Sequence, residues 1–284
     1  MTVDLPDTAI AAVDDVPVQT IRPVRRRIKL HQLVAERQII SVLAGRDLKV
    51  KYKQSLLGPL WLVFQPLALL AGFVVGFSRI ANVHTGGVPY AVFALAGLTV
   101  WSFFQASATI GSASVISNIQ FVRYTPCPRI AFPPAAIIAS IPTFLVTAAG
   151  AIIAAAVSGD LSPRVVLLPL VACWLLVLTL GFVWVTSSLT VRYRDINSAL
   201  PFLLQVGMFL APVGYSIETL NTKAQAVIGL NPLTGLIEAT RWTLIGGYNP
   251  LITPIVVSAV ATVLVAIGGW RVFSRLETTM ADDI

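Results

Sequence analysis

Charged residues are scarce in this chain. Asp, Glu, Lys and Arg make up 12% of its 284 residues, whereas a soluble domain carries about 25%. Hydrophobic residues make up 56%, and the mean hydropathy is +0.81. This composition argues against a water-soluble domain and indicates that lipid is the solvent for most of the chain.

Residues that build metal and catalytic sites are also rare. The chain has only two histidines, His31 and His84, and two cysteines, Cys127 and Cys173, too few and too dispersed for a metal site or a disulfide framework. We interpret Cys173, inside an apolar run, as a small buried hydrophobe. The sequence contains no G-x-x-x-x-G-K-[ST], H-E-x-x-H or G-x-S-x-G motif. We therefore expect no metal, no bound nucleotide and no covalent chemistry in this chain.

Six windows without charge predict an all-α integral membrane protein with six transmembrane helices. A helix rises about 1.5 Å per residue, so roughly 20 apolar residues cross the hydrocarbon layer. The windows run between 54–78, 80–122 (including an outer loop at 82–89), 129–160, 164–192, 195–218 and 242–270.

The positions of the cations predict the orientation. The net charge is +7. If both termini are cytoplasmic, sixteen of the 20 Lys and Arg residues fall on the cytoplasmic side, as the positive-inside rule requires. Basic flanks of membrane spans therefore explain the positive charge more simply than a nucleic-acid partner does.

Three regions differ from a plain helical bundle. Residues 1–24, which are acidic and contain prolines, are expected to form a disordered cytoplasmic tail. Residues 25–55 mix leucines with cations and are typical of an amphipathic helix at the inner interface. Within the six-helix domain, 56–284, residues 217–250 predict two short re-entrant helices between spans five and six, broken at Asn231–Pro232.

Several motifs, in this order, resemble those of ABC-2-type permeases that export polysaccharides across bacterial inner membranes. They are "RDLKVKYKQSLLGPLWLVFQPL" (Arg46–Leu67), "SNIQFVRYTPCPRIAFPP" (Ser117–Pro134), "VRYRDI" (Val191–Ile196), "APVGYS" (Ala211–Ser216), "NPLTGLIEATRW" (Asn231–Trp242) and the tail "FSRLETTMADDI". The similarity spans roughly residues 32–284. The segment "RYTPCPR", with two prolines and a cysteine, departs from the more helical turn expected there.

The resemblance implies a homodimer in the plasma membrane, each copy docked to a separate ATP-binding-cassette subunit that holds ATP and Mg²⁺. It also implies a polymer linked to a polyprenyl diphosphate, such as O-antigen, capsule, teichoic acid or galactan. The loops after spans two and four would then couple this chain to the ATPase, with the candidate residues Asn118, Arg123, Arg129, Arg192, Arg194 and Asp195; alternatively, these loops are charged connectors only.

The cations before the first span have two interpretations. Arg46, Lys49 and Lys53 share one helical face, with Lys51 on another. These four residues set the topology and attract anionic lipids, bind the diphosphate headgroup of the substrate, or do both.

Aromatic and small residues supply further candidates. Most aromatic residues near span ends serve as interface anchors, but Trp61, Trp101 and Phe104 are candidates to line a sugar path. Two pairs of small residues permit close helix approach, either within one subunit or across a dimer interface between spans one and five: Gly72 with Gly76, and Gly207 with Ala211. Glu238 and Arg241 are spaced for a structural ion pair rather than a gate latch.

Two alternative functions remain open on sequence. One is an ABC-2 permease for a drug or a small lipid, which neighbouring genes would distinguish from a polymer exporter. The other is an integral-membrane transferase acting on a lipid-linked sugar, which would need an acid–base or metal cluster near the membrane face.

Overall fold

A computed structural model describes residues 35–53, 57–80, 85, 87–120 and 128–277. The expected tail at 1–24 lies outside this part. All the longer elements in the described residues are helices: α2 (Arg37–Lys53), α3 (Trp61–Phe73), α4 (Tyr90–Ala113), α6 (Phe132–Ile138), α7 (Ile141–Ser158), α8 (Leu168–Arg192), α9 (Asp195–Gly207), α10 (Thr222–Gly229), α11 (Pro232–Leu244) and α12 (Ile252–Leu276). The predicted all-α fold is thus confirmed.

Five helical stretches in this part of the chain are long and apolar enough to cross a membrane. They are Gly58–Ser78, Tyr90–Ala113, Arg129–Ser158, Pro163–Arg192 and Ile252–Leu276. The first begins at Gly58, whose φ of 48° favours glycine, followed by Pro59 in the first turn, where proline is tolerated. The third contains α6 and α7, joined at Ala139–Ser140.

The fifth predicted window does not form one long helix. The helical stretch Asp195–Leu210 is only 16 residues long, about 24 Å at 1.5 Å per residue. The backbone becomes extended at Ala211, with φ −107° and ψ 138°, because the residue before Pro212 is disfavoured in the helical region. The prediction of a full-length span at 195–218 was therefore wrong in its length.

The last predicted window began ten residues too early. Trp242 belongs to α11, and a turn at Gly247, with φ 73°, separates this helix from α12. Sequence reasoning took Arg241 as the charged edge of a span, whereas its side chain is fully buried. By contrast, the predicted break at Asn231–Pro232 is confirmed, because Asn231 Oδ1 caps α11 by accepting from Leu233 N at 3.0 Å.

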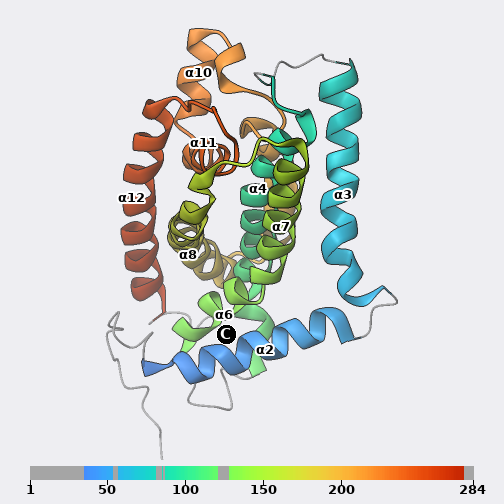
Figure 1. The fold of residues 1–284 in the computed structure, drawn as a ribbon. Coiled ribbons are helices and arrows are strands. Elements are labelled where there is room, and N and C mark those ends of the chain that lie inside the picture. The colour runs from blue at the N-terminus through green and yellow to red at the C-terminus, as the bar shows by residue number, and fades with distance from the viewer. Residues whose placement is uncertain (1–34, 54–56, 81–84, 86, 121–127, 278–284) are drawn as a thin grey trace, which may run out of the picture.

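The helices pack around α4, which contacts α7, α8, α11, α6, α9 and α3 (Figure 1). In the most apolar 18-residue window of α4, 78% of the residues are buried, against 11% for the first span, which contains α3. α3 stands at one side of the bundle and α12 at the opposite side. One long face of α3 is therefore left without protein contacts in the single chain.

The predicted helix before the first span is α2, which lies across one end of the bundle (Figure 1). Its residues Ile40, Leu43 and Ala44 are buried and pack with α6. Val50, counted among the apolar residues of this helix, is 72% exposed. Part of the apolar face thus contacts protein. The position of α2 at a lipid interface stays a prediction.

The contact between α8 and α12 depends on two glycines. A Cβ added to Gly269 would lie 2.8 Å from the carbonyl carbon of Gly181, whereas one added to the neighbouring Gly268 would meet nothing within 4 Å. The missing side chains let the two helix backbones approach closely.

We predict that Gly269→Ala destabilises the protein and that Gly268→Ala does not. Overpacking at a close helix crossing costs about 1–3 kcal/mol, and the control introduces the same methyl group one position away. Thermal unfolding in detergent measures both variants. Equal melting temperatures for the two would show that the close approach of α8 and α12 contributes little.

Candidate functional site

A groove with several polar side chains in its walls lies between α3, α4 and α9. It consists of two adjoining cavities of about 370 Å³ and 690 Å³, which share Trp61, Gln65, Leu69, Gln105 and Pro201 in their walls. The polar side chains along the two cavities are Lys51, Gln65, Ser102, Gln105, Thr109, Thr143 and Gln205. The remaining walls are apolar, but among the polar side chains amides and hydroxyls dominate, so the groove can exchange hydrogen bonds with an uncharged polar ligand.

Lys51 is the only charged residue that lines the groove in the described part of the chain. Desolvation lowers the pKa of its ammonium group from the usual value, although much of the side chain stays exposed. Of the four predicted headgroup ligands, Lys49 and Lys53 are exposed on the same helix. Lys51 is therefore the member of the cluster that lies at the groove itself.

Arg46, the fourth predicted headgroup ligand, is engaged within the protein. Its guanidinium donates to Asp47 Oδ1 at 2.7 Å and to Asn118 Oδ1 at 2.5 Å, and Asn118 Nδ2 in turn donates to Ser114 O at 2.7 Å. These bonds tie α2 to the end of α4. The two residues were assigned to separate sites, a headgroup site and a coupling site, and the structure joins them.

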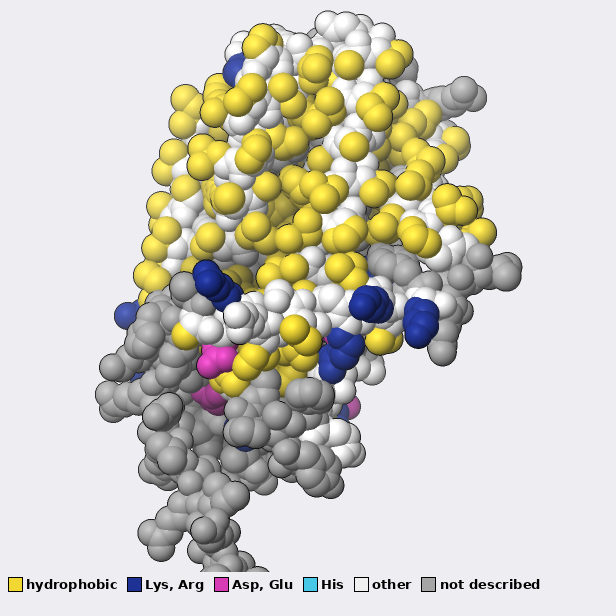
Figure 2. Space-filling view, turned by 60° about the horizontal axis from the view of Figure 1, so that its bottom comes forward, with side chains coloured by type: hydrophobic (Ala, Val, Ile, Leu, Met, Phe, Trp, Pro, Cys, Tyr) yellow, Lys and Arg dark blue, Asp and Glu magenta, His cyan; other side chains and the backbone are white. Residues whose placement is uncertain are grey.

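Cations gather where the hydrophobic surface ends. Figure 2 shows dark blue Lys and Arg side chains in a band below a surface that is mostly hydrophobic, at the end of the molecule where α2 lies. Such a band is typical of a protein whose apolar part lies in lipid and whose charged end faces an aqueous phase.

The three aromatic candidates for a sugar path differ in position. Trp61 is 45% exposed and lines both cavities of the groove. Trp101 and Phe104 are buried in the core, where Phe104 lies 5.1 Å from Phe182 between ring centroids. Trp101 instead donates from Nε1 to Gln105 Oε1 at 3.0 Å and so orients a groove residue. Direct contact with a passing ligand stays a prediction for Trp61, and the burial of the other two does not favour it.

The candidate coupling residues are spread along one end of the bundle. Arg192, Arg194 and Asp195 are exposed between α8 and α9. Arg129 donates from Nη1 to the carbonyl of Glu277 at 2.8 Å, and burial raises the pKa of the Glu277 carboxyl to about 7. Arg123 lies outside the described residues. Arg192, Arg194 and Asp195 are thus the part of the predicted coupling site that is open to a partner.

The two pairs of small residues behave differently. A Cβ on Gly72 or Gly76 would meet nothing within 4 Å. A Cβ on Gly207 would lie 3.5 Å from Trp101, and Ala211 is fully buried. The second pair therefore packs inside one subunit. The first pair has open space beside it in the first span, with Gly72 in α3 and Gly76 in the helical segment Val74–Ile80 that follows, and there the dimer interpretation remains.

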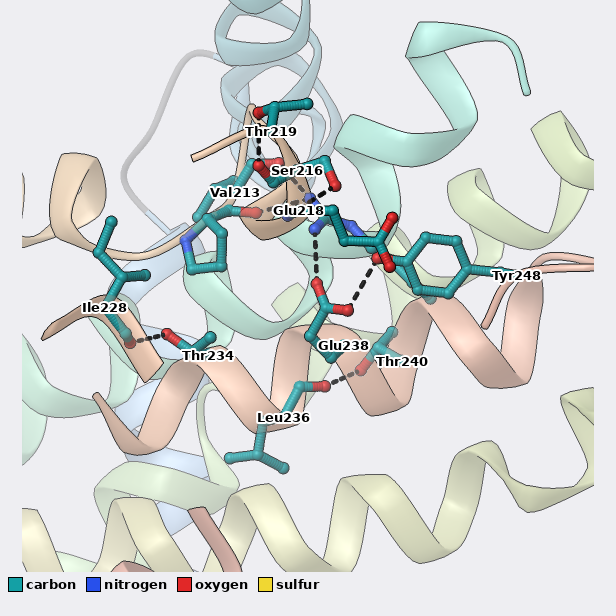
Figure 3. Close-up of polar contacts among 12 residues, drawn as sticks. Val213, Ser216, Glu218, Thr219, Ile228, Thr234, Leu236, Glu238, Thr240 and Tyr248 are labelled. Carbon is teal, nitrogen blue, oxygen red and sulfur yellow. Dashed lines mark hydrogen bonds and ion pairs between the residues drawn. The ribbon is translucent and has the colours of Figure 1, made fainter. Parts of the chain in front are cut away.

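A buried polar network, only partly predicted, lies at the end of the bundle away from α2. Arg241 Nη1 bonds to Glu238 Oε1 at 3.2 Å, and both side chains are at most 1% exposed. The predicted ion pair is confirmed. Tyr248 donates from its hydroxyl to Glu238 Oε2 at 2.8 Å, and Figure 3 shows the two side chains pointing toward each other.

Arg241 also contacts residues that are distant from it in sequence. Its Nη2 donates to the carbonyls of Pro212 and Val213 at 2.6 and 2.9 Å, and its guanidinium carbon lies 3.5 Å from the centroid of the Phe93 ring. These contacts connect α11 to the segment after α9 and to α4. The i, i+3 spacing predicts Glu238 as one partner of Arg241. The other partners of Arg241 lie about 30 or more residues away in sequence, so local spacing does not predict them.

The described part of the chain contains one cysteine, Cys173, which lies outside the groove between α3, α4 and α9. Among the described residues, no three His, Cys, Asp or Glu side chains cluster to hold a metal ion. Cys173 is exposed, so the prediction that it is a buried hydrophobe was wrong. It lies on a face of α8 turned away from the core, where an apolar run can face lipid as well as protein.

These features together define a multi-pass, all-helical membrane protein with a polar groove and a cationic end. The chain belongs to the family of ABC-2 type transporters, which matches residues 38–245. It is the membrane permease component of such a transporter; in this family the ATPase is a separate chain, with which the permease pairs.

Three relatives show what this chain is similar to. Two O-antigen export system permease proteins of Klebsiella pneumoniae are 29% and 26% identical, over 72% and 86% of this chain and 78% and 94% of their own lengths. A polysialic acid transport protein of Escherichia coli is 20% identical over 74% of this chain and 82% of its own length.

We predict that Arg241→Met strongly destabilises the protein, by about 3–5 kcal/mol, because it leaves Glu238 buried without its partner. The double variant Glu238→Gln, Arg241→Met removes both charges and should recover part of this loss. Lys223→Met, which removes an exposed cation on α10, serves as the control. Thermal unfolding in detergent gives the comparison. Additive losses in the double variant would show that the pair is not coupled.

Proposed function

We propose that this chain is the permease of an exporter that moves a lipid-linked polysaccharide from the cytoplasmic to the outer face of the inner membrane. The proposal rests chiefly on the groove between α3, α4 and α9. Its amides, hydroxyls and the Trp61 ring offer hydrogen bonds and flat apolar faces to sugars. With few charges along it, a polymer can slide without strong local binding. The names of the relatives support the same class of substrate.

The proposed topology has six crossings, with the short helix α9 and the residues after it as the fifth. Both termini are cytoplasmic. Supporting this, α2 and the end of α12 lie at the same end of the bundle (Figure 1), and most cations lie on that side in this arrangement. The helices α10 and α11 form the proposed re-entrant segment at the outer face.

A second copy of the chain completes the proposed path. The groove is open along α3, and the first span has room for another helix beside Gly72, in α3, and Gly76, just after it. Two copies facing each other across α3 and α9 would enclose a continuous polar passage. Each copy would dock an ATP-binding subunit, which holds ATP and Mg²⁺, near Arg192, Arg194 and Asp195.

Lys51 has the central place in the proposed recognition of the substrate headgroup. It lies at the groove with a lowered pKa, and partial desolvation strengthens the attraction between its charged form and a diphosphate. Lys49 and Lys53 supply further positive charge nearby, whereas Arg46 holds α2 in place through Asn118. The headgroup would thus be gathered at the mouth of the path.

Deletion of the gene tests the function directly. We expect the surface of the deletion strain to lack one polysaccharide. The same polymer, still attached to its lipid carrier, should accumulate inside the cell. Extraction and analysis of lipid-linked glycans measures this. An unchanged glycan profile combined with increased sensitivity to a toxic amphiphile would instead favour the drug or small-lipid permease.

Charge reversal tests the headgroup site. We predict that Lys51→Glu lowers export by about thirtyfold, because replacing attraction by repulsion at one cation changes binding by about 2 kcal/mol, while the complex with the ATPase still assembles. Lys223→Glu, on the exposed side of α10, is the matched control. Surface polymer and co-purification of the ATPase are measured together. Normal export by an assembled Lys51→Glu complex would refute a headgroup role for this residue.

A further inference from the structure

A second groove, unrelated to the proposed path, lies on the opposite side of the bundle. It has a volume of about 1050 Å³ and runs between α8 and α12, with α11 as its floor. Its walls are largely apolar and include Leu170, Val177, Ile252 and Val263, which are 48–74% exposed. Apolar side chains exposed at membrane depth face hydrocarbon, and an empty groove of this size would forfeit many dispersion contacts.

The outer end of this groove carries a fixed positive charge. The guanidinium carbon of Arg164 lies 4.7 Å from the ring centroid of Trp242, which lines the groove. Arg164 Nε donates to Ser162 Oγ at 2.9 Å and Nη2 to the carbonyl of Ile245 at 3.3 Å. These contacts hold the guanidinium against Trp242, next to the lining of the groove.

In the described part of the chain, no carboxylate forms an ion pair with Arg164. The ion pairs there join Arg46 to Asp47 and Arg241 to Glu238, and neither involves Arg164. Hydrogen bonds of Arg164 to described residues use Nε and Nη2 and the backbone amide, which leaves Nη1 to bind an external acceptor. A guanidinium with an available N–H is well suited to a phosphate oxygen.

We propose that this groove binds one anionic phospholipid of the outer leaflet, with its phosphate at Arg164 and an acyl chain along α8 and α12 over α11. The apolar walls suit the chain, and the stacked arginine suits the phosphate. A second copy of the protein is a less fitting occupant, because the open face of α3 lies on the far side of the bundle from α12 (Figure 1). The site does not depend on what the transporter exports.

Quenching of tryptophan fluorescence by brominated lipid tests this site. Trp174 and Trp242 line the groove. The full-length protein, with its ATPase, is reconstituted in phosphatidylcholine vesicles that contain either dibrominated phosphatidylglycerol or dibrominated phosphatidylcholine. The part of the quenching that is lost in a Trp174→Phe variant reports the groove.

We expect phosphatidylglycerol to bind about fivefold more tightly than phosphatidylcholine, the preference that one cation near an anionic headgroup provides. Arg164→Gln should abolish the preference, Arg164→Lys should keep most of it, and Lys223→Gln should leave it unchanged. Ala259→Phe, which fills the groove, should reduce quenching by both lipids.

Three results would overturn the proposal. Equal quenching by both lipids in the wild-type protein would mean that only unselective boundary lipid is present. A preference that persists in Arg164→Gln would place the headgroup elsewhere. Absence of quenching at Trp174 by either lipid would mean that protein covers the groove. The melting temperature of each variant, measured in the same vesicles, ensures that only folded protein is compared.

Discussion

The constraint that shapes this structure is that hydrocarbon cannot satisfy charges or backbone polar groups. Helices satisfy the backbone, and most charged residues lie beyond the ends of the apolar stretches. Glu238 and Arg241 on α11 are instead buried in the protein, where they are neutral as a pair and are bonded on several sides. This network fixes α11 against α4 and the segment after α9.

Much of the fold follows from the sequence because charge-free windows, prolines and glycines act locally. The number of long apolar helices was predicted to within one, and the break before α11 follows from Pro232. Both errors concern burial, which depends on tertiary packing rather than on local sequence. The sequence predicts Arg241 at the edge of a span because burial of a charge depends on distant partners, and it predicts Cys173 as buried because an apolar run does not distinguish lipid from protein.

The groove itself could not be predicted in this way. Gln65, Gln105 and Gln205 are spread over three helices, and only packing brings them to the walls of one cavity system. The motif at Arg46–Leu67 contains the groove residues Lys51 and Gln65, and the structure separates its cations in space, with Lys51 at the groove and Arg46 bonded to Asn118. A polar passage of this kind offers no source of energy, so in the proposed function an ATP-binding partner supplies it.

The most direct test of this account is transport by the purified permease in vesicles. A lipid-linked polysaccharide is placed in one leaflet, and its appearance on the other side is followed with the permease alone, with the ATP-binding subunit, and with that subunit inactivated. The account predicts movement only when an active ATPase and ATP are present. Movement of the polymer by the permease alone would contradict it.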